Sequence, residues 1–299
     1  MRAPNCNPRY NVKSLAVTVS SVALSACFAV TDLERFAIGR GSTNYDDLDF
    51  GMKAAKSHVT ERFEFRVIDS DNVIQCRGVI DPVDAPDFDL TVRNAVPKVK
   101  APYRLDFYAE HDLNGAYSGI PLDHSWRVEP LADSPATLGT ADDGVFSVAY
   151  EHNTSFTDLE VWPRNNPTRS APKDTGAPAI ARVRNLPEEA LGRLFEMRVV
   201  DHGTGHTVGF FRVPVLKHRE FELNIGGVVD AGVDYDVKFY LDANGNRTYE
   251  NPAGTGTNLD RGWSVSTSSD ASGFIVNFDP TNAASNVDVG TAYPAQSLK

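Results

Sequence analysis

The run Phe-Glu-Phe-Arg-Val-Ile-Asp at residues 63–69 returns as Phe-Glu-Met-Arg-Val-Val-Asp at residues 195–201, an offset of 132 positions. The run Tyr-Arg-Leu-Asp-Phe-Tyr at 103–108 returns at 235–240 as Tyr-Asp-Val-Lys-Phe-Tyr, with the same offset. A third pair follows a slightly longer loop: Asp-His-Ser-Trp-Arg-Val at 123–128 and Asp-Arg-Gly-Trp-Ser-Val at 260–265. Three matches in the same order predict an internal duplication.

Within each copy, apolar residues alternate with polar ones. In the first copy Phe63, Phe65 and Val67 alternate with Glu64 and Arg66. Short alternating segments between Gly, Pro, Asn and Asp turns predict half-buried antiparallel strands. Their number and length resemble an Ig-like or transthyretin-like sandwich, a likeness of architecture that implies no function. The predicted fold class is all-β, with two tandem antiparallel β-sandwiches.

The expected strands of the first copy are seven in number: 47–51, 62–69, 73–81, 87–93, 103–110, 124–129 and 144–151. Two segments, 52–60 and 186–193, are mildly helical, and we expect one turn at most in each. Trp126 and Trp263 occur in both copies and are expected to be core anchors. The predicted organisation is a signal peptide (1–26), a tether (27–46), sandwich one (47–160), a proline-rich linker (161–178), sandwich two (179–283) and a tail (284–299).

The first 27 residues have the form of an export signal. Arg2, Arg9 and Lys13 precede an apolar run that is too short to span a bilayer as a permanent helix. The run ends in Leu-Ser-Ala-Cys at 24–27, which resembles the lipobox of bacterial lipoproteins. That resemblance implies cleavage before Cys27 and acylation of Cys27, so the expected partner is a lipid bilayer. An ordinary secretory signal with a Cys at its cleavage site is the alternative.

The residue after Cys27 bears on the compartment. Phe28 stands where an Asp typically retains lipoproteins in an inner membrane, so we expect the outer membrane or the cell surface. Cys76 is then the one cysteine left without an assigned role, and its apolar surroundings predict a buried small hydrophobe. The net charge is −11 and becomes more negative when the cationic leader is removed, which argues against a nucleic-acid partner.

The histidines distinguish the two copies. The first copy holds His58, His111, His124 and His152, and at the equivalent places the second copy holds Ala190, Ala243, Arg261 and Pro280. If each strand reverses the chain, all four histidines and Met52 lie at one end of the first sandwich. Loops that converge at one end of a rigid sandwich commonly build binding sites. His202, His206 and His218 of the second copy are expected to be exposed loop residues.

Imidazole is a frequent ligand of zinc, copper, nickel and iron. Three histidines with Met52 would favour copper, and three with a carboxylate (Glu110, Asp112 or Asp123) would suit zinc or iron. The alternative is that each histidine bonds a neighbouring loop and no site exists.

An acidic loop follows residue 109 in the first copy and residue 241 in the second. Oxygen-bearing side chains recur there at alternate positions: Glu110, Asp112, Asn114, Asp242, Asn244 and Asn246. The spacing resembles the front half of some calcium loops, but neither copy has the glutamate expected at position twelve. Because both copies keep the pattern, we interpret it as a structural turn, with weak calcium binding as the alternative.

The sequence contains no G-x-S-x-G, no H-E-x-x-H, no P-loop and no G-x-G-x-x-G motif. We therefore expect a non-enzymatic envelope lipoprotein whose first sandwich binds copper or zinc and whose second is a spacer or docking copy. The rival expectation is a structural, adhesion or protein-interaction module of the cell envelope without a metal site.

Overall fold

The computed structural model describes residues 44–98, 102–114, 117–128, 139–141, 145–152, 172–173, 176–247, 249–250, 252, 260–282 and 284–285. The predicted leader, Cys27, most of the tether and linker, and nearly all of the tail lie outside these residues. Among the described residues, no helix combines the length and apolar character needed to cross a membrane.

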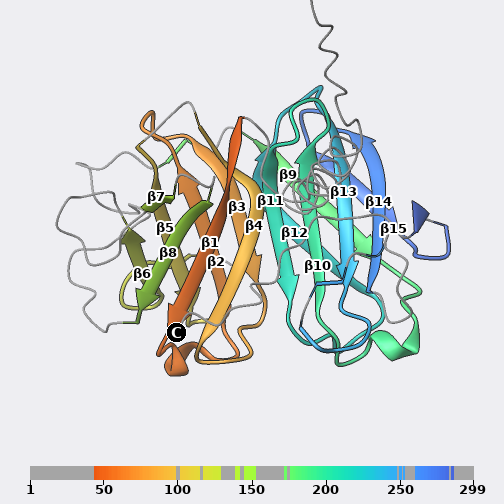
Figure 1. Ribbon diagram of the computed structural model, residues 1–299, viewed down its shortest axis with the longest axis horizontal. Coiled ribbons are helices and arrows are strands. Elements are labelled where there is room, and N and C mark those ends of the chain that lie inside the picture. The colour runs from red at the N-terminus through yellow and green to blue at the C-terminus, as the bar shows by residue number, and fades with distance from the viewer. Residues whose placement is uncertain are drawn as a thin grey trace, which may run out of the picture. The chain divides into compact units, whose positions relative to one another are not determined.

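The first half folds as two β-sheets packed face to face (Figure 1). Its strands are β1 (Tyr45–Lys53), β2 (Arg62–Ile68), β3 (Ile74–Ile80), β4 (Phe88–Pro97), β5 (Arg104–Glu110), β6 (His124–Val128), β7 (Gly139–Ala141) and β8 (Val145–Glu151). One sheet has the order β4-β1-β8-β7, and the other side of the sandwich is β3-β2-β5-β6. Each of the seven predicted strands of this half is confirmed, and β7 is an additional short strand.

The second half repeats this arrangement. Its strands are β9 (Ala177–Val183), β10 (Phe195–Asp201), β11 (Thr207–Val213), β12 (Phe221–Val229), β13 (Asp234–Leu241), β14 (Arg261–Ser268), β15 (Phe274–Phe278) and β16 (Ala284–Ser285). The order β12-β9-β15 corresponds to β4-β1-β8, and β11-β10-β13-β14 corresponds to β3-β2-β5-β6. The all-β sandwich class predicted from the sequence is therefore confirmed.

The offset of 132 positions also occurs in the strand register. In the first half Phe65 lies opposite Phe107, and in the second Met197 lies opposite Phe239, so both pairs are separated by the offset of 132 positions. Pairing is mostly antiparallel. The first strand and the last long strand of each half are parallel neighbours (β1 with β8, β9 with β15).

The two halves share one sheet. Strand β3 pairs in parallel with β11, which joins the halves into a nine-stranded sheet of order β16-β14-β13-β10-β11-β3-β2-β5-β6. Phe210 of β11 is buried in the hydrophobic core of the first half, and Val79 of β3 in that of the second. The halves are thus joined through backbone hydrogen bonds and exchanged core residues as well as through the linker.

Buried charged side chains of the second half lie at its contact with the first half. Arg212 on β11 pairs with Glu196 on β10 at 2.7 Å and donates to the backbone oxygen of Asp89 on β4 at 2.8 Å. Arg198 donates to the backbone oxygen of Thr91, also on β4. These bonds fix β4 of the first half over β10 and β11 of the second.

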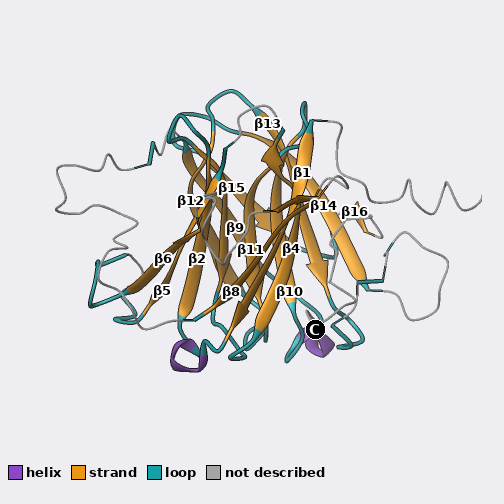
Figure 2. Ribbon diagram, turned by 60° about the vertical axis from the view of Figure 1, so that its left-hand side comes forward, coloured by secondary structure: helices purple, strands orange, loops and turns teal. Residues whose placement is uncertain are grey.

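Both predicted helical segments are single 3-10 turns, η2 (Lys56–His58) and η3 (Glu188–Ala190). They lie at the same end of the strands (Figure 2). Cys76 is free and buried, and Trp126 and Trp263 are buried in the two cores, as expected.

One expectation about the second copy is wrong. His206 is buried rather than exposed, because it stacks on Tyr45 of β1 with ring centroids 4.6 Å apart. Its Nε2 lies 3.4 Å from the backbone oxygen of Ala95. A contact between the two halves, which the local sequence of a turn does not reveal, covers it. His202 and His218 are exposed, as predicted.

Candidate metal centre

His58 ends the one-turn helix η2 in the connection between β1 and β2. Backbone bonds fix this connection: the Thr60 amide donates to the Val83 oxygen at 2.8 Å, and the Val83 amide donates to the Glu61 oxygen at 2.8 Å. The turn also includes two residues with positive φ, Ala54 and Thr60. The result is a rigid loop that holds the His58 side chain 99% buried, since its exposed fraction is 1%.

His124 and His152 reach the same place from strand ends. His124 begins β6 and lies opposite Ala109 of β5. His152 directly follows β8, and its amide donates to the backbone oxygen of Lys53 at the end of β1. Both side chains are half-buried, so the cluster has one side toward solvent.

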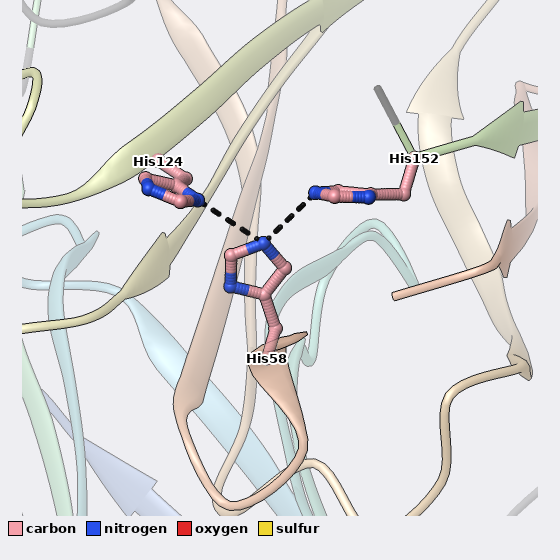
Figure 3. Close-up of side chains that lie close together, drawn as sticks. All are labelled: His58, His124 and His152. Carbon is pink, nitrogen blue, oxygen red and sulfur yellow. Dashed lines mark hydrogen bonds between the residues drawn. The ribbon is translucent and has the colours of Figure 1, made fainter. Parts of the chain in front are cut away.

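The three imidazoles converge on one point (Figure 3). His58 Nε2 lies 3.1 Å from His152 Nε2 and 3.2 Å from His124 Nδ1. One ligand nitrogen from each of the three histidines lies within 4.8 Å of those of the other two. Tetrahedral metal–nitrogen bonds of about 2.0–2.1 Å place two ligand nitrogens about 3.3 Å apart, so the two short distances already suit a shared metal ion.

Trp126 lies beneath the histidine trio, which consists of His58, His124 and His152. Its ring centroid lies 5.4 Å from that of His58 and 5.6 Å from that of His152, both in edge-to-face geometry. Because Trp126 is 0% exposed and also stacks on Phe107, it restricts the imidazoles from below. An ion held by the trio would enter from the solvent side.

A buried carboxylate lies behind the trio. Glu61 Oε2 accepts a hydrogen bond from His58 Nδ1 at 2.7 Å, and Glu61 Oε1 accepts one from His111 Nδ1 at 2.6 Å. His111 is 58% exposed at its side chain and stacks parallel to His124 with centroids 5.5 Å apart. The fourth histidine therefore joins the cluster through Glu61 and does not belong to the group of three converging nitrogens.

The environment favours neutral ligands. Burial, followed by the neighbouring His58 and His111 rings, lowers the pKa of His124 to about 4. Burial and His58 also lower the pKa of His152. The hydrogen bond and charge of Glu61 raise the pKa of His111 instead. At neutral pH two members of the trio thus present imidazole lone pairs, the form that binds metals.

The equivalent end of the second half has different chemistry. Arg261 begins β14 opposite Leu241, the register that His124 holds with Ala109 in the first half. Arg261, Trp263 and Pro280 line a shallow pocket there. Ala190 ends η3 where His58 ends η2. Both halves therefore have a Trp at this position, whereas the second half lacks the histidines that surround it in the first.

The structure places the other predicted site residues as follows. Met52 is buried in the first hydrophobic core, 1% exposed. Glu110 is buried at the end of β5, and Asp112 is exposed and bonds Asn114 within its own turn. Asp123 accepts hydrogen bonds from the backbone amides of His111 and Ser118.

The acidic loop of the second half is closed by its own backbone. Asp242 accepts the amides of Gly245 and Arg247, while Asn244 and Asn246 donate to Glu250. These bonds hold the Asp242 carboxylate within its own loop. They favour the interpretation of this loop as a structural turn.

Glu61 was not among the residues proposed from the sequence. The repeat contains the signal: the offset of 132 positions takes Glu61 to Arg193, a reversal of charge. Comparing every ionisable residue between the copies, and not the histidines alone, would have found it.

Comparisons with protein-family models, with curated proteins and with solved structures find no match to this chain.

Proposed function

We propose that the protein is a lipid-anchored envelope protein whose first sandwich binds a single transition-metal ion, zinc or copper. The ligands are Nε2 of His58, Nδ1 of His124 and Nε2 of His152. The observation that carries the proposal is the approach of His58 Nε2 to the other two nitrogens, at 3.1 and 3.2 Å. The three side chains come from one loop and two strand ends, and one ligand nitrogen of each lies within 4.8 Å of the others.

The three ligands are all imidazole nitrogens, and this favours some metal ions over others. Imidazole nitrogen suits Zn²⁺ and Cu²⁺, whereas thiolate and thioether sulfur favour Cu⁺. The trio contains no sulfur, and Cys76 is buried in the first core with a pKa raised by burial to about 12. A fourth position toward solvent would be open to water or to a donor from a partner. The role proposed is binding, because the chain has no motif of a nucleophilic or hydrolytic enzyme.

The proposed cellular location of the protein rests on the predicted signal sequence at its N-terminus. The Leu-Ser-Ala-Cys run at 24–27 supports acylation of Cys27, and the acidic net charge of −11 supports attraction of cations to the surface. A protein tethered at the cell surface or outer membrane would meet metal ions as they enter the envelope. The second half would serve as a spacer or as a docking surface for an envelope partner.

The test is metal binding by purified protein. We expect one equivalent of Zn²⁺ or Cu²⁺ by calorimetric titration and elemental analysis, and loss of that equivalent in His124→Ala. His202→Ala is the control, since His202 is an exposed histidine that bonds Asp236 and lies outside the trio. Equal binding by His124→Ala and wild type, or no binding by wild type, would favour a structural or adhesion module instead.

A further inference from the structure

We infer that Glu61 is the positioning residue of this centre: one oxygen orients His58 for the metal, the other oxygen is held by His111, and the carboxylate charge makes the site prefer a dication. This inference rests on the proposed metal-binding function. It assigns a role to a residue that touches no metal itself.

The first oxygen determines which nitrogen of His58 can bind. A carboxylate accepts hydrogen bonds and does not donate them, so Nδ1 of His58 must carry the proton in the bond of 2.7 Å to Glu61 Oε2. In the neutral ring the lone pair is then on Nε2. That atom is the one that faces both His124 and His152. Carboxylates commonly fix metal-binding histidines in this way, and they raise the basicity of the ligand.

The second oxygen fixes the carboxylate. His111 Nδ1 donates to Oε1 at 2.6 Å, so both oxygens of Glu61 are occupied. The backbone of Glu61 is held as well, because its amide donates to the oxygen of His58 and its oxygen accepts the amide of Val83. With an exposed fraction of 6%, Glu61 has little freedom to rotate away from His58.

The second half supports a role specific to the site. At the position equivalent to Glu61 it has Arg193, whose Nη1 donates to the backbone oxygen of Asn244 in the neighbouring loop. A carboxylate needed to support the sandwich fold would be expected in both halves, as Glu64 and Glu196 are. Glu61 changes together with the histidines, while the strands around it do not.

Charge gives the carboxylate a second effect. Its negative charge lies one imidazole ring away from the metal position, in a buried setting where electrostatic interactions are stronger than in water. A dication gains twice the attraction of a monocation at the same distance. Glu61 should therefore strengthen binding of Zn²⁺ and Cu²⁺ more than binding of Cu⁺.

Two variants separate orientation from charge. Glu61→Gln keeps an oxygen that can accept from His58 Nδ1 and removes the charge, whereas Glu61→Ala removes both. Dissociation constants for Zn²⁺, Cu²⁺ and Cu⁺ would be measured by chelator competition on the purified protein. Asp236→Asn is the matched control, because Asp236 makes a comparable bond of 2.9 Å to His202 away from the trio.

We expect Glu61→Gln to weaken Zn²⁺ and Cu²⁺ binding by about 10-fold and Glu61→Ala by up to about 100-fold, the range seen when such supporting groups are removed. Cu⁺ binding should change less in Glu61→Gln, and Asp236→Asn should match wild type. Ring ¹⁵N shifts of His58 in the unaltered protein should show a proton on Nδ1. This last readout needs no variant to fold.

The inference is overturned if His58 carries its proton on Nε2, or if both Glu61 variants bind Zn²⁺ within twofold of wild type while His58→Ala does not bind. A Cu⁺ loss equal to the Zn²⁺ loss would overturn the charge preference. Failure of the metal function itself looks different: His58→Ala, His124→Ala and His152→Ala would then all bind as wild type does.

Discussion

His124 and Arg261 occupy the same place in the two halves of the protein. Each begins the strand that carries the buried Trp of its half, and each lies opposite the last apolar residue of the preceding strand, Ala109 or Leu241. Equivalent backbone positions therefore hold an imidazole with a lowered pKa in the first half and a guanidinium in the second. Site chemistry has changed at this position while the fold has not.

A bound metal should stabilise the first half. An ion that binds the folded state and not the unfolded chain adds about 2.7 kcal/mol to the free energy of unfolding when its free concentration is 100 times Kd. We expect Zn²⁺ to raise the thermal midpoint of wild type and to leave that of His58→Ala unchanged. Differential scanning calorimetry with and without Zn²⁺ measures both. A rise of the same size in His58→Ala would place the ion elsewhere.

Acid should destabilise the metal-free protein through His124. Burial and the adjacent imidazoles lower its folded-state pKa to about 4, against about 6.5 in an unfolded chain. Between these values the unfolded chain binds more protons, so stability is complete above pH 6.5 and is lost as pH falls toward 4. Urea unfolding at pH 7 and pH 4.5 should show a smaller difference for His124→Ala than for wild type.

His206 has a pKa lowered by burial to about 4 and contributes with the same sign. The raised pKa of His111 contributes with the opposite sign, since stability from its protonated form is lost as pH rises. Both groups are present in wild type and in His124→Ala, so the difference between the two proteins reports on His124 and on the imidazoles coupled to it. An identical pH dependence in the two proteins would contradict the assigned environment of this ring.

The second half should accept a metal once its side chains are exchanged. Ala190→His, Arg261→His and Pro280→His place imidazoles at the equivalent positions over Trp263, and Arg193→Glu supplies the supporting carboxylate. We expect this fourfold variant to bind a second equivalent of Zn²⁺. The threefold variant that keeps Arg193 should bind it more weakly, because a cation remains beside the site. A stoichiometry of one in both variants would mean that the halves differ in loop geometry as well as in side chains.

A methyl group added at Gly78 on β3, where the two halves meet, should destabilise the protein. A Cβ atom built on Gly78 would lie 2.0 Å from Cζ of Phe65, whose ring is fully buried. We expect Gly78→Ala to lower the free energy of unfolding by about 1–3 kcal/mol, the usual cost of overpacking. Phe65→Leu should cost less in the Gly78→Ala background than in wild type. Strictly additive costs in urea unfolding would contradict the contact.

Attachment to membranes should depend on Cys27. If the Leu-Ser-Ala-Cys run at 24–27 directs acylation, then Cys27→Ser should release the protein from the membrane fraction and abolish labelling by a fatty acid. Cys76→Ser is the control, since that thiol is buried. Membrane retention of Cys27→Ser would mean that another anchor holds the protein, whereas wild-type protein outside the membrane fraction would favour an ordinary secretory signal.

The strands could be predicted because their signal is local. Alternation of Phe63, Phe65 and Val67 with polar neighbours sets a period of two, and the turns between strands contain Gly, Pro, Asn or Asp. That the four histidines lie at one end of the first sandwich could be predicted, because chain reversal in an antiparallel sandwich sends alternate connections to the same end, but the convergence of three of them on one point could not. The first inference depends on residues close together in sequence, and the second depends on the order and direction of the strands.

The rest depends on contacts between distant segments. Nothing in the composition of β3 or β11 specifies that these two edges pair, so the shared nine-stranded sheet was not predicted. The same contact between halves buries His206 against Tyr45. Glu61 was missed because a lone glutamate after a helical turn has no distinctive pattern until its two histidine partners are placed around it.

The most direct test of the account is an anomalous-scattering map of crystals soaked with Zn²⁺. The account predicts one peak about 2.0–2.1 Å from His58 Nε2, His124 Nδ1 and His152 Nε2 together, with Glu61 still bonded to His58 Nδ1. Zinc bound elsewhere, with these three nitrogens still bonded only to one another, would contradict it.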